Sequence, residues 1–106
     1  MLFLTRIPVR YNDGSRIPTS ELEAVKTRAW QDFGGFTLSG PTEGAWVDDR
    51  TGTVHREMGY GLEVVIEPTQ KDEAREFVQW AGKRLKQKEM LLIFRDDHVE
   101  FIDTRQ

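Results

Sequence analysis

Cysteine is absent from this chain of 106 residues, so the sequence offers neither a disulfide framework nor a thiolate metal site. Long apolar runs are also missing, and residues 1–10 lack the apolar core that a signal peptide needs. Neither sign of charge dominates, because 15 basic and 18 acidic residues give a formal net charge of -3. This balance gives no general attraction to nucleic acid or to an anionic membrane. We therefore expect a cytoplasmic protein without a membrane or nucleic-acid partner.

Apolar residues are frequent enough for a folded core. The hydrophobic fraction is 38%, and it includes three tryptophans. Burial of this much apolar surface offsets the entropy lost on ordering the chain, which argues against disorder. A chain of this length has room for one modest core, so the sequence predicts a single domain over residues 1–106.

The first part of the chain changes from an alternating pattern to a helical one. Alternating apolar side chains predict a strand over residues 2–11. Pro8 has no N–H to donate, which favours an edge strand or an irregularity at that point. Ser20 and Glu23 have the spacing of a capping box at the start of a helix, and Gly34 is placed to end that helix.

The central part predicts a hairpin. A strand that starts near Gly35 meets a Gly/Pro-rich interruption at residues 39–44, so we expect it to be broken or bulged there. Residues 48–52 have the sequence DDRTG, which is typical of a turn between two strands. Alternating apolar residues then predict a long strand over residues 54–66, which stops at Pro68.

The last part predicts one more helix and two short strands. The helix is expected to begin near Thr69, with Thr69 or Asp72 as its cap. The short strands are expected at residues 90–95 and 99–103, on either side of an acidic turn. The apolar stripe of this helix consists of Ala74, Phe77, Val78, Ala81 and Leu85.

The order of these elements specifies an α+β fold. Strand, helix, strand, strand, helix, strand is the ferredoxin-like βαββαβ order, an antiparallel sheet with two helices on one face, followed here by a short extra C-terminal strand. The second face of such a sheet meets water, a ligand or another subunit. We therefore look for function on this open face.

Four short motifs follow one another along the chain. They are FGGFT at residues 33–37, G-x-W at 44–46, G-x-x-x-R-E at 52–57 and KQKEMLLI at 86–93. This arrangement resembles an uncharacterised family of small bacterial ferredoxin-like domains. The resemblance implies the fold. It implies no activity, because that family has no assigned function and a fold alone does not specify one.

The candidate catalytic residues are His55 and Glu57. Alternation places both on the strand face opposite Val54 and Met58. A histidine and a glutamate two residues apart on one face suit acid/base cooperation or metal ligation. Two ligands do not fill a zinc site, and we expect no metal and no cofactor. The chain also lacks a phosphate-binding glycine motif and a nucleophile elbow.

Aromatic and guanidinium side chains are the candidate ligand-binding groups. A strand tryptophan either stacks on a planar ligand or packs in a core, and an arginine fork binds phosphate or carboxylate bidentately. If Arg6 and Arg10 point away from the helices, they share the open face with His55 and Glu57. The full set of candidate ligand-binding residues is Arg6, Arg10, Tyr11, Trp46, Arg56 and Tyr60.

Three classes of function stay open. The first is a non-enzymatic binding module, a homodimer or larger oligomer that holds a small anionic or nucleotide-like ligand between subunits. A sensor or sequestering protein carried by a phage or plasmid is one example. The second is a small cofactor-independent enzyme of the dimeric ferredoxin-like type, in which His55 and Glu57 act. The third is a protein-interaction domain, such as an inhibitor or antitoxin, that uses an exposed sheet edge. The half-covered sheet and the tryptophan beside a glycine-rich break favour the first.

Overall fold

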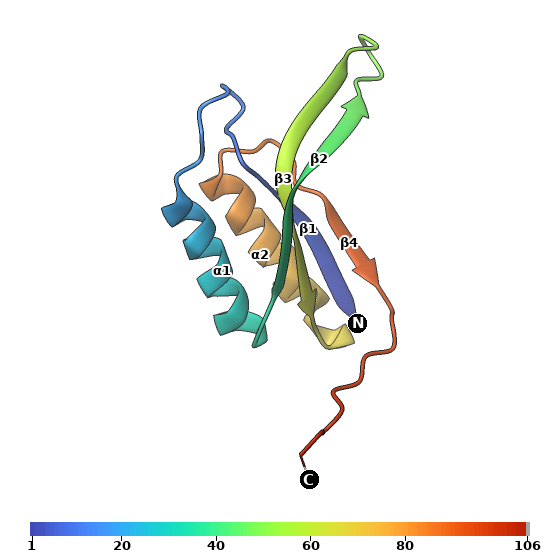
Figure 1. Ribbon diagram of the computed structural model, residues 1–106. Coiled ribbons are helices and arrows are strands. Elements are labelled where there is room, and N and C mark those ends of the chain that lie inside the picture. Colours follow the sequence, from blue (N-terminus) through green and yellow to red (C-terminus); the bar gives the residue numbers. More distant parts are fainter. Residues whose placement is uncertain (106) are drawn as a thin grey trace.

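Two helices cover one face of a four-stranded antiparallel sheet in the computed structural model, which describes residues 1–105 (Figure 1). The strand order is β2-β3-β1-β4, as the predicted ferredoxin-like fold requires. In chain order the elements are β1 (Leu2–Pro8), α1 (Thr19–Phe33), β2 (Thr37–Val47), β3 (Val54–Val65), the 3-10 turn η1 (Pro68–Gln70), α2 (Lys71–Arg84) and β4 (Leu92–Arg95). Within this part of the chain, no helix is long and apolar enough to cross a bilayer.

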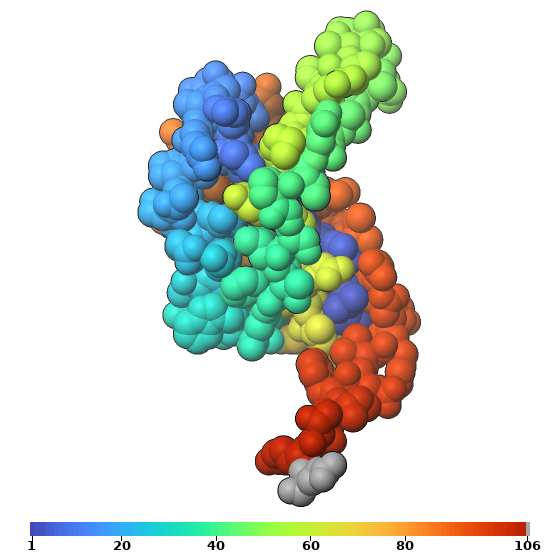
Figure 2. Space-filling model, in the orientation of Figure 1, coloured from blue at the N-terminus to red at the C-terminus, as the bar shows by residue number. Residues whose placement is uncertain are grey.

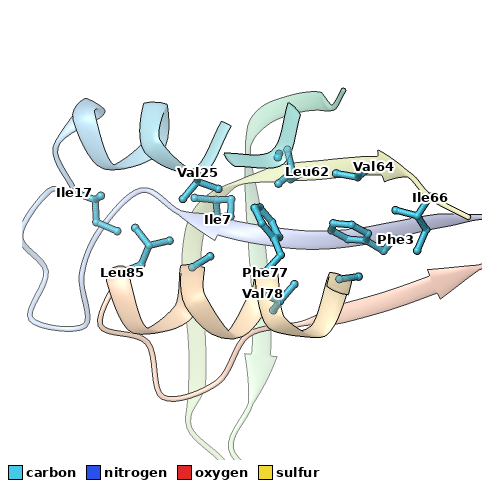
Figure 3. Close-up of a cluster of buried hydrophobic side chains, with 13 residues drawn as sticks. Phe3, Ile7, Ile17, Val25, Leu62, Val64, Ile66, Phe77, Val78 and Leu85 are labelled. Carbon is cyan, nitrogen blue, oxygen red and sulfur yellow. The ribbon is translucent and has the colours of Figure 1, made fainter. Parts of the chain in front are cut away.

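The core lies between the sheet and the two helices (Figure 3). Phe3 on β1 and Phe77 on α2 are fully buried in this core, and the half-buried Phe33 at the end of α1 packs against both rings. The ring centroids are 5.2 Å apart for Phe3 and Phe33, and 5.7 Å apart for Phe33 and Phe77. All five residues of the predicted α2 stripe are buried, which confirms the helical periodicity.

Alternation along β1 and β3 divides the sheet into two faces. Phe3 and Ile7 are buried under the helices, whereas Arg6 lies on the open face. Arg6 is opposite Gly61 in the ladder, so the odd-numbered residues of β3 continue the open face. Where the helices cover the sheet, the even-numbered residues of β3, such as Leu62 and Val64, point toward them.

The prediction that β1 is an edge strand is wrong. β1 lies between β3 and β4 in the sheet. The N–H of Val9 donates to Met58 O on β3 at 3.0 Å, so the nitrogen of Pro8 faces the β4 side. β4 pairs only with residues 2–5 of β1, and Pro8 therefore lies beyond the point where a donor is needed.

The predicted N-terminal caps of both helices are also wrong. α1 has Pro18 at its N-cap and no side-chain cap, and Glu23 pairs with Lys26 at 2.8 Å, so the Ser20–Glu23 capping box does not form. Gly34 ends this helix in the left-handed conformation, with a φ of 89°, as predicted.

The second helix is preceded by η1, which shifts its start by two residues from the predicted Thr69. Neither Thr69 nor Asp72 provides a cap. The capping box is made instead by Glu67 and Gln70 around η1, where the Glu67 N–H donates to Gln70 Oε1 at 2.9 Å. Asp72 pairs with Arg75 at 2.8 Å.

The predicted extra C-terminal strand over residues 99–103 does not form within the described chain. After Arg95 the chain leaves the sheet and runs away from it (Figure 1). β4 also starts later than predicted, at Leu92, because Met90 packs against Gly82 of α2 instead of joining the ladder.

The β2–β3 hairpin extends beyond the helices as a two-stranded ribbon, seen at the top of Figure 2. We call residues 42–58 the arm. A register shift between Ser39 and Thr42 marks its base, which confirms the predicted bulge. At the tip the N–H of Gly52 donates to Asp48 O at 2.7 Å, and this contact closes the predicted hairpin turn.

Candidate functional site

An exposed aromatic pair lies on the outer face of the arm, the face that continues the open face of the sheet. Trp46 on β2 and His55 on β3 are direct partners in the ladder. Their ring centroids are 4.3 Å apart with an interplanar angle of 18°, which is a stacked arrangement. Trp46 remains 55% exposed. The pair therefore presents a planar surface to solvent instead of packing into the core.

Arg6 connects β1 to both strands of the arm beside this pair. Its Nη1 donates to Thr42 Oγ1 at 3.0 Å, and its Nη2 donates to Thr42 O and to Glu57 O, the latter at 3.4 Å. Its Nε donates to Glu57 Oε1 at 3.3 Å. All three guanidinium nitrogens are thus directed at the base of the arm.

Two glycines make room for the guanidinium. A Cβ built at Gly44 would lie 3.2 Å from Arg6 Cζ. A Cβ built at Gly59 would lie 3.1 Å from Arg6 Nε and 2.9 Å from Ile7 O. Side chains at these positions would push the guanidinium off the strands.

The Arg6 contacts change what the site can bind. Because its N–H donors bind Glu57 and Thr42, the Arg6 guanidinium is not free to bind a phosphate or carboxylate bidentately. Glu57 uses Oε1 for Arg6, and the hydrogen bonds among residues 1–105 leave its Oε2 open. The arrangement therefore offers a fixed carboxylate acceptor next to an aromatic surface.

Two of the other candidate residues lie in the loop after β1. Because β1 ends at Pro8, Arg10 is outside the sheet, and its Nη1 donates to Gly14 O at 3.1 Å. Tyr11 packs against the core, with Lys86 Nζ 5.1 Å from its ring centroid. Neither residue shares the outer face with Trp46.

The remaining two candidates lie on the opposite side of β3. Arg56 is on the inner face of the arm, 3.8 Å from Glu43 in an exposed ion pair. Tyr60 is half-buried against the core and lines a small hollow with Ile17 and Leu22. The structure thus brings together Arg6, Trp46, His55 and Glu57, and it separates Arg10, Tyr11, Arg56 and Tyr60 from them.

A surface hollow larger than the one beside Tyr60 lies elsewhere. It has a volume of about 740 Å³ and runs along α2 and the segment that leads to β4. Met90 and Leu92 form its apolar side, while Arg75, Glu76 and Lys83 contribute charges of both signs. The hollow shares no residue with the outer face of the arm, and its mixed charges do not converge on one ligand group. Among residues 1–105, no three His, Cys, Asp or Glu side chains are placed to hold a metal ion.

No family model and no curated protein matches this chain, in agreement with its resemblance to small domains without an assigned function. The solved structures similar to it include a phage SAM lyase in complex with S-methyl-5'-thioadenosine, with a TM-score of 0.53, and a phage SAM lyase in the apo state, with a TM-score of 0.51. Each is 16% identical to this chain and covers 86% of it. The matched part is 76% of the first of those chains and 75% of the second. At this identity the likeness shows the fold.

Proposed function

We propose that this chain is a binding module for a small nucleoside-like ligand, held on the outer face of the arm. The observation that carries the proposal is the exposed Trp46–His55 stack beside a carboxylate that Arg6 fixes in place. A purine ring stacks on an exposed indole, and a carboxylate accepts hydrogen bonds from ribose hydroxyls. The open Oε2 of Glu57 is suited to that second contact.

The ligand class follows from the charges at the site. A nucleotide phosphate needs a free guanidinium or ammonium group, but Arg6 is engaged and Arg56 lies on the opposite face of the arm. The sequence-based hypothesis named a small anionic or nucleotide-like ligand. We therefore propose a nucleoside-like ligand without a phosphate group. The phage SAM lyase complex supports this choice, because its ligand, S-methyl-5'-thioadenosine, is an uncharged nucleoside. Binding without turnover suits a sensor or a sequestering protein.

Replacing Trp46 with alanine is expected to weaken the binding of S-methyl-5'-thioadenosine by about 5- to 150-fold, since base stacking on an aromatic side chain contributes about 1–3 kcal/mol. Isothermal titration calorimetry measures this change. Trp30→Ala is the matched control, because Trp30 on α1 is 52% exposed and Trp46 is 55% exposed. Equal affinities for the two variants would contradict the assignment of the site.

Catalysis is the second candidate function, because His55 and Glu57 lie together on the outer face and the similar structures are lyases. If the chain only binds its ligand, SAM is expected to stay intact during incubation with the protein. Chromatography of the mixture measures how much SAM remains. Conversion of SAM that is lost in Glu57→Gln and kept in Glu63→Gln would favour an enzyme instead. Glu63 is the matched control because it lies on the same strand and the same face as Glu57.

A further inference from the structure

The C-terminal segment has the pattern of a strand without a partner strand. In residues 99–103, Val99 and Phe101 fall on one side of an extended chain and Ile102 falls on the other. Phe101 is 85% exposed and Ile102 is 72% exposed, more than any other large apolar side chain among residues 1–105. The segment joins no ladder within the described chain. The segment thus presents an apolar side chain on each side and an unpaired backbone, as a strand without a partner does.

The arm lacks a third strand. Val47, Val54 and Met58 are exposed on its inner face, and Trp46 is exposed on its outer face. β2 is one of the two edge strands of the sheet, so the backbone on its free side is unpaired along the arm. A two-stranded ribbon is marginally stable in water, and a third strand with apolar contacts stabilises it.

The arm and the C-terminal segment project from opposite ends of the molecule (Figures 1 and 2). The long axis of the molecule measures 56 Å, against 30 and 26 Å for the other two axes. The C-terminal segment of one chain therefore points away from its own arm. An arm that meets this segment belongs to a second copy.

We propose that residues 99–103 of one copy add as a third strand to the free edge of β2 in the arm of a second copy. Both partners carry apolar side chains on both faces: Phe101 and Ile102 on the segment, Trp46 and Val47 on the arm. Strand addition places these side chains beside one another along the edge of the ribbon and pairs the exposed backbone. The donated segment and the receiving edge are different surfaces, so the contact is heterologous and forms a ring or an open chain of subunits. The proposal does not depend on the ligand.

The first test is the mass of the full chain in solution, measured by size-exclusion chromatography with light scattering. We expect an oligomer for the full chain and a monomer for Phe101→Glu/Ile102→Glu. The control His98→Glu/Thr104→Glu also adds two carboxylates but changes exposed polar residues that flank the segment, and it is expected to stay oligomeric. A monomeric full chain, or an oligomer that persists in Phe101→Glu/Ile102→Glu, would overturn the proposal.

The second test locates the contact by cross-linking. Because the chain has no cysteine, each introduced cysteine is the single thiol of its chain. Glu100→Cys chains are mixed with Ala45→Cys chains and treated with a bifunctional maleimide that spans neighbouring strands. Ala45 is exposed on β2 of the arm. We expect a cross-linked dimer of the two different chains. Gln31→Cys on the exposed side of α1 replaces Ala45→Cys in the control. An equal yield with both partners, or no mixed dimer, would show that the segment does not bind the arm.

Discussion

Replacement of Phe77 by alanine is expected to lower the free energy of unfolding by about 3–5 kcal/mol. Phe77 is fully buried, and its ring centroid lies 5.9 Å from that of Phe3 and 5.7 Å from that of Phe33. The truncation opens a cavity where β1, α1 and α2 meet, and the surrounding backbone elements hold that cavity open. Urea denaturation followed by circular dichroism measures the loss.

Trp30→Ala is the control for this prediction, because it also removes an aromatic ring from a helix but at an exposed position. Its effect is expected to stay within about 0.5 kcal/mol, as for other surface substitutions. Equal losses for Phe77→Ala and Trp30→Ala would contradict the described core.

The second large effect is expected at Gly59, where alanine should destabilise the protein by about 1–3 kcal/mol. The added Cβ would lie 2.9 Å from Ile7 O, a backbone atom in the neighbouring strand, and 3.1 Å from Arg6 Nε. Relief of this overlap requires β1 and β3 to separate and displaces Arg6 from the base of the arm. The readouts are the melting temperature and the affinity for S-methyl-5'-thioadenosine, and both are expected to fall.

Gly61→Ala provides a matched control on the same strand and the same face. A Cβ at Gly61 meets nothing within 4 Å, so alanine is expected to be neutral or to stabilise the protein by about 0.4–1 kcal/mol through the unfolded state. If Gly59→Ala is as stable as Gly61→Ala, the close packing of Arg6 on the glycine backbone is not present in solution.

Hydrophobic periodicity predicted the elements whose faces are buried. Helical spacing predicted that the α2 stripe from Ala74 to Leu85 contacts the core, and alternation predicted the same for Leu62 and Val64. All of these residues are buried there. Features that depend on a neighbouring strand were not predictable in this way. Pro8 is tolerated in a central strand because β4 is short, and residues 99–103 stay unpaired because no strand of the same chain lies beside them.

The candidate site also has parts that the sequence pattern predicts and parts that depend on neighbouring strands. Alternation along β3 placed His55 and Glu57 together on one face. The same alternation places Arg56 and Tyr60 on the other face, so they do not join this site. The approach of Arg6 to Thr42 depends on the register between three strands. No sequence pattern marks Thr42 as a partner of Arg6. The glycines at positions 44 and 59 are evident in the sequence, but the sequence does not show that Arg6 packs against Gly44 and Gly59.

Nuclear magnetic resonance of the three tryptophan indole N–H groups tests the central claim most directly. The chain has only Trp30, Trp46 and Trp80, and the signal missing from Trp46→Phe identifies Trp46. During titration with S-methyl-5'-thioadenosine, the Trp46 signal is expected to shift to saturation while the other two signals stay in place. Shifts confined to Trp30 or Trp80, or no shift of any of the three signals at millimolar ligand, would contradict binding on the outer face of the arm.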